Sequence, residues 1–527
     1  MKNQMSRFLL ASTFAFTLVM MTGCGSQTST PAPGQNAAPA AATANNATAE
    51  KVLTIANGSD MLSFDIHDHS SASTEAIHVN IFNYLLKHDA EGKFVPDLAE
   101  SWENVNPTTW RFKLRQGVKF QNGDPFTAAD VKFTLERVAK DEKLSEHSNY
   151  DEIQEVKVVD DHTVDVITKN ADPILLNRLS RSGSSMLPSK YIAEKGWEEF
   201  LKNPVGTGPY KFQEWKRDDR LVLVKNDGYF GDKPKWDKVI FRVIQEDSTR
   251  VAELMTGGID VALNIPPSDE ERIESNEGTS VITGPSQRVM TMEVRVTPGR
   301  VTADPRVREA IDLAIDEKAI IDNLYAGKGT PTQTRVTPGN FGAHIGLYNK
   351  YNYDPERAKQ LLAEAGYANG VDVTFTAPSG RYLKDKETAE LVTAMLTEVG
   401  FRVKLELMEW SAFNERLSAR KMDELFMVAY GNSMFDAALA LDRVTIARTK
   451  DRTDYTNPEV EALYKAASQN MNPTERLKQF EKIQEIVAKE LPQIYLLQMD
   501  STYGVNDRIA YKPRVDEMLY VDEITLK

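Results

Sequence analysis

The chain has 527 residues, enough for several domains with substantial cores, and its 41% hydrophobic and 27% charged residues are typical of a soluble globular body. Its formal net charge of −14 excludes a general electrostatic attraction to nucleic acid or to anionic lipid. The single cysteine, Cys24, excludes disulfides within the chain, and it leaves the predicted body without a thiol nucleophile or a thiolate metal site.

The first 23 residues are predicted to be a lipoprotein signal peptide. Lys2 and Arg7 precede an apolar run at 8–21, which has the length of a signal core and is too short to span a bilayer. The small residues before Cys24 resemble a bacterial lipoprotein cleavage box, which implies that Cys24 becomes the lipidated first residue; an ordinary secretory signal is the alternative. Residues 24–50 carry almost no charge and little apolar bulk, so they are predicted to be a disordered tether.

The folded body is predicted to begin with an alternating strand at 51–55. A polar loop at 65–73 and a helix-like stretch at 74–86 follow. Residues 109–115 alternate between large apolar and basic side chains, which indicates a half-buried strand.

Later elements are marked by helix-start chemistry. The segment 127–130 has the pattern of a capping box and is expected to open a helix at 131–139. Further strands are expected at 371–375 and 401–407, so strands alternate with helices and a mixed α/β fold is predicted. An Asx residue followed by proline at the first helical position predicts four more helix starts, at Asp304-Pro305, Asp354-Pro355, Asn457-Pro458 and Asn472-Pro473.

The stretch 203–212 contains two prolines that fix φ and two glycines, Gly206 and Gly208, that permit positive φ. A phosphate-binding loop is one interpretation, but Pro209 breaks the G-x-G-x-x-G pattern and Lys211 is not followed by Ser or Thr. We therefore expect a tight, sharply specified turn that leads into a strand.

Residues that carry catalysis are not apparent. The sequence has no G-x-S-x-G, H-E-x-x-H or P-loop motif, and no pair of carboxylates stands out as general acid and base. His67 and His69, with Glu75 and His78 nearby, could hold a metal, but histidines of a polar loop are more often solvated. We expect no cofactor and no metal site, and a binding protein rather than an enzyme.

Several motifs together indicate a family. In this order and spacing they resemble the family-five extracellular solute-binding proteins of ABC importers, a group that includes dipeptide-, oligopeptide-, glutathione- and nickel-binding lipoproteins. The resemblance covers nearly everything from Lys51 to the C-terminus. The segments that carry it are Val95–Trp102, Leu114–Val131, Asn203–Phe212, Asp304–Ala310 and Tyr353–Tyr367.

This resemblance implies a two-lobed α/β fold like that of periplasmic binding proteins, the class II, three-domain variant, with a ligand cleft between the lobes. Lobe I is expected from 51–85, 203–287 and 500–527, an inserted small domain from 86–202, and lobe II from 288–499. Closure of such a cleft is driven by contacts that the ligand makes better in the closed state.

Candidate ligand contacts come from the same resemblance. In peptide-binding relatives an Asp three residues after an aromatic residue pairs with the α-amine of the ligand. Here Tyr430 takes the aromatic place, Asn432 follows it, and Ser433 stands where the Asp would be. A hydroxyl cannot compensate a buried ammonium as a carboxylate can, so either Asp436 substitutes or the ligand lacks a free amine at that point.

Four further residues complete the predicted ligand site. Trp410 matches a tryptophan that lines the cleft in several relatives, with a core position as the alternative. Arg181 lies near the place where nickel-chelate relatives present an arginine to a carboxylate, with a plain surface arginine as the alternative. His69 and Ser71, in the polar loop, are predicted to be polar contacts.

The resemblance implies a membrane-anchored substrate-binding component of an ABC importer, which captures a short peptide or peptide-like solute and delivers it to the permease subunits. A receptor for chelated nickel or another metal chelate, using His67 or His69 with Arg181, is the alternative, and a surface peptidase is a third hypothesis without a nucleophile or metal signal. The protein is expected to be a monomer at the outer face of the bacterial cell membrane or in the periplasm, held by lipid on Cys24, with no nucleic-acid partner.

Overall fold

The computed structural model describes residues 50–90 and 92–527. The predicted signal peptide, the lipidation site at Cys24 and almost all of the tether lie outside the described residues. Within the described ranges, every helix is either too short or too polar to cross a membrane.

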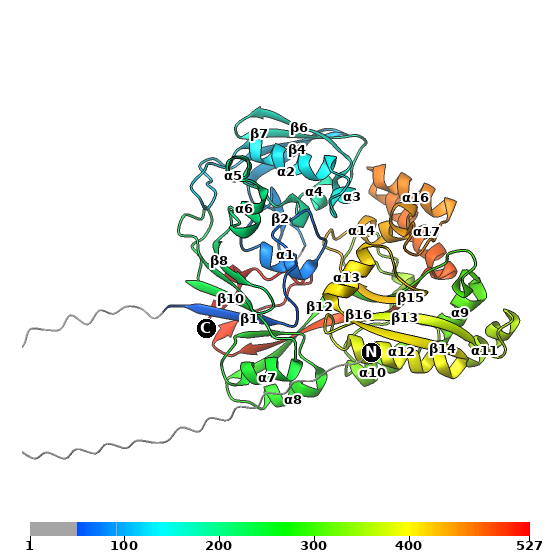
Figure 1. Cartoon of the computed structure of the whole chain (residues 1–527). Helices are drawn as coiled ribbons and strands as arrows, with labels where there is room; N and C mark the ends of the chain where they lie inside the picture. Colours follow the sequence, from blue (N-terminus) through cyan, green and yellow to red (C-terminus); the bar gives the residue numbers. More distant parts are fainter. Residues whose placement is uncertain (1–49, 91) are drawn as a thin grey trace, which may run out of the picture. The chain divides into compact units, whose positions relative to one another are not determined.

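A ten-stranded mixed sheet runs through the folded body (Figure 1). Its order places strands from distant parts of the chain side by side, so the sheet is discontinuous in sequence. From one edge to the other the strands are β14 (Phe401–Glu409), β13 (Val371–Ser379), β15 (Leu425–Tyr430), β12 (Thr279–Val294), β16 (Gln493–Asn506), β11 (Val261–Leu263), β1 (Val52–Asn57), β10 (Lys238–Val243), β9 (Arg220–Lys225) and β8 (Tyr210–Lys216).

Two long antiparallel strands, β12 and β16, connect the two halves of this sheet. Their ladder is interrupted between Pro285 and Val289, where the register shifts. Each half buries its own core, one around Phe375 and Phe426 and the other around Ile55 and Leu223. The body therefore has two separate cores, joined by two strands whose ladder is irregular. This is the arrangement expected of two lobes connected by a hinge.

A third core lies under a separate four-stranded antiparallel sheet, at the top of Figure 1. Helix α2 covers this sheet, and the hairpin of β2 (Leu86–His88) and β3 (Phe94–Pro96) connects it to the body. The domain boundaries given above stay a prediction. The sheet consists of β4 (Ala99–Asn106), β5 (Thr109–Leu114), β7 (Thr163–Thr168) and β6 (Ile153–Asp160).

The capping box and the four Asx-Pro helix starts are confirmed, although the helix at the capping box begins three residues before the predicted 131. Thr127 and Asp130 form the capping box of α2 (Ala128–Lys140). In the other four, the Asx side chain accepts hydrogen bonds from backbone N–H groups and proline takes the first helical position. These four helices are α9 (Pro305–Ala314), α11 (Pro355–Glu364), α16 (Pro458–Gln469) and α17 (Pro473–Glu490).

The described residues form further α-helices besides these five. They are α1 (Ala72–His78), α3 (His147–Tyr150), α4 (Leu175–Arg178), α5 (Ser189–Lys195), α6 (Trp197–Lys202), α7 (Asp247–Met255), α8 (Pro267–Glu274), α10 (Glu317–Leu324), α12 (Asp385–Val399), α13 (Trp410–Ser418), α14 (Ala437–Leu441) and α15 (Ile446–Thr449). A short pair of strands, β17 (Ile509–Ala510) and β18 (Thr525–Leu526), lies near the C-terminus.

Helix α1 ends eight residues earlier than the pattern predicts. The side chain of Asn80 donates to the carbonyl oxygen of Leu519 at 2.9 Å and accepts from the N–H of Val521 at 2.9 Å. These bonds tie the end of α1 to a segment about 440 residues later, so a tertiary contact ends the helix. Propensity within the helix could not reveal it.

The turn at 203–212 is as sharply specified as predicted, but for a different reason. Neither Gly206 nor Gly208 has a positive φ, so that part of the prediction is wrong. A Cβ on Gly206 would lie 1.9 Å from the carbonyl oxygen of Ile81, and the N–H of Gly208 donates to that same oxygen at 2.8 Å. The glycines are needed because two backbones pack directly against each other.

Candidate functional site

A large cavity of about 730 Å³ lies at the junction of the two halves of the large sheet. The loop before α1 and residues 142–149 line one wall, and the chain between Trp410 and Arg452 lines the other. Gln287 and Arg288, from the interrupted part of β12, lie between the walls. The volume is in the range of natural small-molecule sites, and it adjoins the strands that join the lobes.

Seven of the eight residues predicted to contact ligand line this cavity. Each lobe contributes some of them, so the structure brings together residues more than 300 positions apart. Whether they bind ligand stays a prediction. The seven are His69, Ser71, Arg181, Trp410, Tyr430, Asn432 and Ser433.

Asp436 is the exception. Its carboxylate caps the N-terminus of α14 and forms a bidentate ion pair with Arg476, with both N–O distances at 2.7 Å. The residue is buried and is not part of the cavity lining. In this structure Asp436 therefore does not supply the carboxylate that Ser433 lacks.

Arg181 is held by a buried carboxylate. It forms an ion pair with both oxygens of Glu146, which is fully buried. Burial alone would raise the pKa of Glu146, but the charge and the hydrogen bonds of Arg181 outweigh it and hold that pKa at about 2. The guanidinium is thus a fixed part of the wall and not a free surface group.

The two walls of the cavity touch each other. The Nε of Arg181 donates to the hydroxyl of Ser433 at 3.0 Å, and the side-chain amide of Asn177 donates to the carbonyl oxygen of Met434 at 2.6 Å. Arg448 donates to the Oδ1 of Asn149 at 3.1 Å. Ser433 therefore takes part in a contact between the walls, at the position where relatives are expected to carry an Asp.

Three arginines surround the ring of Tyr430. The guanidinium carbons of Arg335, Arg443 and Arg452 lie 4.2, 5.1 and 5.8 Å from its centroid. Arg452 is paired with Glu293 at 3.2 Å, and it also donates to the Tyr430 hydroxyl. Sequence reasoning found the tyrosine and missed the cations around it.

A fourth arginine missed by the sequence, Arg381, lies beside Tyr382 and Trp410, at 4.9 and 5.3 Å from their ring centroids. Burial and the charge of Arg288 lower its pKa, and its Nε has no hydrogen-bond partner among the described residues. Trp410 is half-buried and stacks on Phe413 with a centroid distance of 5.8 Å. Trp410 therefore both borders the core and lines the cavity.

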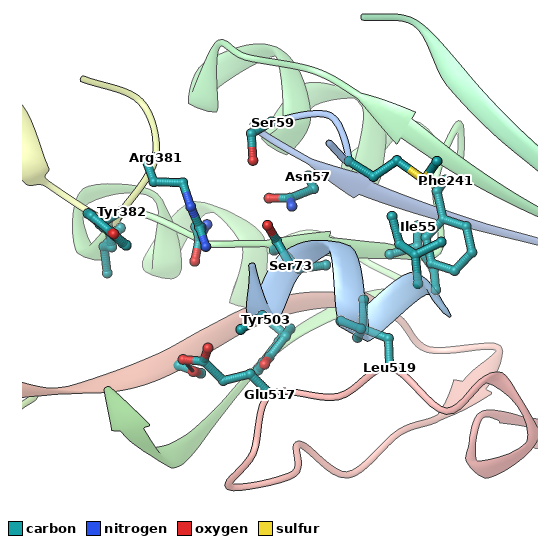
Figure 2. Close-up of a pocket in the computed structure, with 18 of the residues that line it drawn as sticks. Ile55, Asn57, Ser59, Ser73, Phe241, Arg381, Tyr382, Tyr503, Glu517 and Leu519 are labelled. Carbon is teal, nitrogen blue, oxygen red and sulfur yellow. Dashed lines mark hydrogen bonds between the residues drawn. The ribbon is translucent and has the colours of Figure 1, made fainter. Parts of the chain in front are cut away.

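A smaller cavity of about 80 Å³ adjoins the larger one (Figure 2). Arg381 and Tyr382 lie at one end of it, and Ile55, Phe241 and Leu519 lie at the other. Ala72, Arg288 and Glu517 are among the residues that line both cavities. A group held near Arg381 thus has an apolar compartment beside it.

Of the two histidines in the metal hypothesis, only His69 lines the cavity. His67 is fully buried and does not line the cavity: its Nε2 contacts the carbonyl oxygen of Gly183 at 2.9 Å and its Nδ1 contacts Arg137 at 2.6 Å. Burial lowers the pKa of His67 and of His69 to about 4. In the described part of the chain, no three His, Cys, Asp or Glu side chains are placed to share a metal ion.

Comparison with known proteins gives consistent results. The family described as bacterial extracellular solute-binding proteins, family 5 middle, matches residues 93–450. The glutathione-binding protein GsiB of Salmonella paratyphi A is 29% identical over 465 residues, which cover 86% of this chain and 90% of the relative.

Two solved structures are similar over almost their whole length. One is the ABC transporter-associated periplasmic binding protein DppA from Helicobacter pylori, in complex with the peptide STSA, with 26% identity, a TM-score of 0.83, and coverage of 90% of this chain and 98% of that one. The other is NikZ from Campylobacter jejuni in complex with Ni(L-His), with 23% identity, a TM-score of 0.78, and coverage of 90% and 99%. These likenesses confirm the predicted two-lobed α/β fold.

Proposed function

The chain belongs to the bacterial extracellular solute-binding proteins of family 5, and from this membership we propose that it captures a short peptide or a peptide-like solute for an ABC importer. One observation carries the proposal: a cavity of about 730 Å³, lined from both lobes, adjoins the two strands that connect them. A solute in that cavity contacts both walls at once, so its binding favours the closed arrangement.

Delivery requires the protein to stay near a permease. A lipid on Cys24 would hold it at the outer face of the cell membrane, and residues 25–49, which carry no charge, would give the body its reach. A monomer suffices for this role, because one chain supplies both walls of the cavity. The work is capture and release of a solute, and no step in it requires catalysis.

A metal-chelate receptor is the second candidate. His69 favours it, since this residue lines the cavity and its Nε2 has no hydrogen-bond partner among the described residues. His67 and Arg181, the other two residues of that hypothesis, are already engaged by Arg137 and Glu146. We therefore place the metal chelate behind the peptide-like solute.

A thermal-shift screen separates the two candidates. The purified protein is melted with dipeptides, oligopeptides, glutathione and nickel with histidine. A solute at about 100 times its Kd should stabilise the folded state by about 2.7 kcal/mol. We expect peptides or glutathione to raise the Tm; a rise with nickel and histidine alone would favour the chelate, and turnover of a bound peptide would contradict a receptor.

The smaller cavity gives a prediction about side-chain preference. Ser73 lines it, and Ser73→Leu places an isobutyl group where an apolar side chain of the ligand would lie (Figure 2). For a leucine-containing dipeptide we expect affinity to fall roughly 10- to 150-fold, the value of burying one aliphatic side chain. Calorimetry with the matching glycine dipeptide should show little change. Ser73→Ala is the control, because it removes the hydroxyl without filling the space.

A further inference from the structure

The charge of the large cavity differs from that of the chain. The protein has a formal net charge of −14, yet eight of the residues that line this cavity are arginines. Most of these arginines are buried or half-buried, where an unpaired charge is costly. We therefore compare the arginines of the cavity with the carboxylates that are paired with them.

Around Tyr430 the carboxylates are outnumbered. Glu293 is paired with Arg452 at 3.2 Å, and Asp442 is paired with Arg448 at 2.8 Å. Arg443 has the same carboxylate as its partner, with its Nε 3.5 Å from the Oδ1 of Asp442. Arg335 has no carboxylate within ion-pair distance among the described residues, and its one side-chain hydrogen bond is to the carbonyl oxygen of Ala440 at 3.2 Å. Burial lowers the pKa of Arg443 to about 10, as expected for a cation that is incompletely compensated.

A second excess of positive charge lies at Arg381. The nearest acidic side chain of the lining, Glu517, forms its ion pair with Arg288. Arg381 itself is 8% exposed and lies beside the rings of Tyr382 and Trp410, where the charges of Arg288 and Glu517 also act on it. Its planar group remains available for a bidentate contact with an anion.

The sheet places the two cationic groups beside each other. Strands β13 and β15 are parallel neighbours, with Phe375 opposite Leu425 and Thr376 opposite Phe426. Arg381 follows the carboxyl end of β13, and Tyr430 ends β15. Ligands of α/β sheets commonly bind at such strand ends.

The cavity offers little to an ammonium group. Of the five acidic residues that line it, Asp68 and Glu142 are exposed, and Asp516 is paired with Arg514. Glu75 is buried and already accepts hydrogen bonds from the Tyr84 hydroxyl at 3.1 Å and the Ser182 N–H at 2.6 Å. Glu517 is engaged by Arg288. Ser433, at the position expected to bind an amine, is neutral and accepts from Arg181.

We propose that the natural solute is a small polyanion with at least two carboxylates, one bound by Arg335 and Arg443 beside Tyr430 and another by Arg381 beside Trp410, and that it needs no free amine. This proposal rests on the proposed function and narrows it to acidic peptides and peptide-like polycarboxylates. The bound carboxylates supply the negative charge that the walls lack.

Calorimetry on the purified protein tests the preference for carboxylates with ligands that differ in charge and in the presence of a free amine. The dipeptides Glu-Glu, Ala-Ala and Lys-Lys are compared with N-acetyl-Glu-Glu and with glutarate. We expect Glu-Glu to bind about 100-fold more tightly than Ala-Ala, N-acetyl-Glu-Glu to bind within a few-fold of Glu-Glu, and Lys-Lys to bind most weakly. Affinity for Glu-Glu should fall as salt is raised.

Substitution of single arginines tests which of them bind the carboxylates. Arg335→Gln, Arg443→Gln and Arg381→Gln should each weaken Glu-Glu roughly 10- to 150-fold, the loss of one hydrogen bond to a charged group. Arg402→Gln, an exposed arginine at the start of β14 that is paired with Asp372, is the matched control and should leave affinity unchanged. Circular dichroism checks that each variant is folded.

The outcomes separate the preference for polyanions from the function as a peptide receptor. Equal or tighter binding of Ala-Ala or Lys-Lys would overturn the polyanion proposal and leave a peptide receptor standing. Binding of glutarate without any peptide would support the polyanion and contradict the peptide-like solute. No binding of any of the five ligands would overturn the polyanion proposal, and unchanged affinity in all three arginine variants would overturn the assigned contacts.

Discussion

Arg181→Ala is expected to lower the free energy of unfolding by about 3–5 kcal/mol, the cost of breaking a buried ion pair by removing one partner. The physical reason is Glu146, which is fully buried and would lose the one ion pair that it forms among the described residues. Urea denaturation followed by circular dichroism measures the change. The variant should also bind carboxylate ligands more weakly, because the cavity loses a cation.

The double variant Arg181→Met with Glu146→Gln is the control. It removes both charges, so most of the lost stability should return. A double variant as unstable as Arg181→Ala would show that packing, and not the unpaired charge, is what matters. A single variant with wild-type stability would contradict the buried pair itself.

The same pair predicts a pH dependence. The pKa of Glu146 lies at about 2 in the folded protein, below its ordinary value of 4.5. Its contribution is therefore fully present above about pH 4.5 and is lost as the pH falls toward 2; for this shift it amounts to about 3 kcal/mol. Urea denaturation at a series of pH values should show wild-type stability falling more steeply over this window than that of the double variant. Parallel curves would contradict the assignment.

Ser433→Asp is expected to close the protein without ligand. The Nε of Arg181 already donates to the Ser433 hydroxyl across the two walls at 3.0 Å. A carboxylate there would replace the neutral acceptor of this guanidinium with a charged one, worth about 1.5–3 kcal/mol and thus a roughly 10- to 150-fold shift toward the closed state. Neutral Ser433 keeps this contact weak, so that closure depends on the solute.

Spin labels can report this shift, because Cys24 is the only cysteine in the chain. In a Cys24→Ser background, labels are attached at two exposed positions, Lys157→Cys on β6 and Lys465→Cys on α16. Double electron–electron resonance should show a ligand-free Ser433→Asp variant with one dominant distance, where the parent shows a broader distribution. Ser433→Asn is the control, because asparagine is neutral and has the shape of aspartate, and it should resemble the parent. An unchanged distance distribution in Ser433→Asp would contradict a role of the contact between Arg181 and residue 433 in closure.

Local chemistry was enough to predict much of the fold. Asx-Pro pairs and the capping box act within one turn, so their residues carry the whole signal, and the four Asx-Pro starts and the capping box are confirmed. The end of α1 was missed because Asn80 bonds to the carbonyl oxygen of Leu519. The role of Gly206 was misjudged because its neighbour is the backbone of Ile81, more than 120 residues away in sequence.

The site was only half predictable, for a similar reason. Tyr430, Ser433 and Trp410 came from a family resemblance, and the structure places all three at the cavity. Arg335, Arg381, Arg443 and Arg452 belong to no motif and are scattered over more than 100 residues. The pairing of β13 with β15 brings Arg381 close to the arginines around Tyr430. Because the strand order cannot be read from the sequence, the sequence does not show that these arginines line one cavity.

Closure of the two lobes around a solute can be followed with the same spin-label pair on the otherwise wild-type protein. The ligand is whichever of Glu-Glu or N-acetyl-Glu-Glu binds more tightly by calorimetry, at a concentration that saturates the site. We predict that it converts a broad distribution of distances between Lys157→Cys and Lys465→Cys into a single narrow one, and that Arg335→Gln requires more ligand to reach it. A ligand that binds by calorimetry and leaves the distribution unchanged would contradict capture by closure of the two lobes.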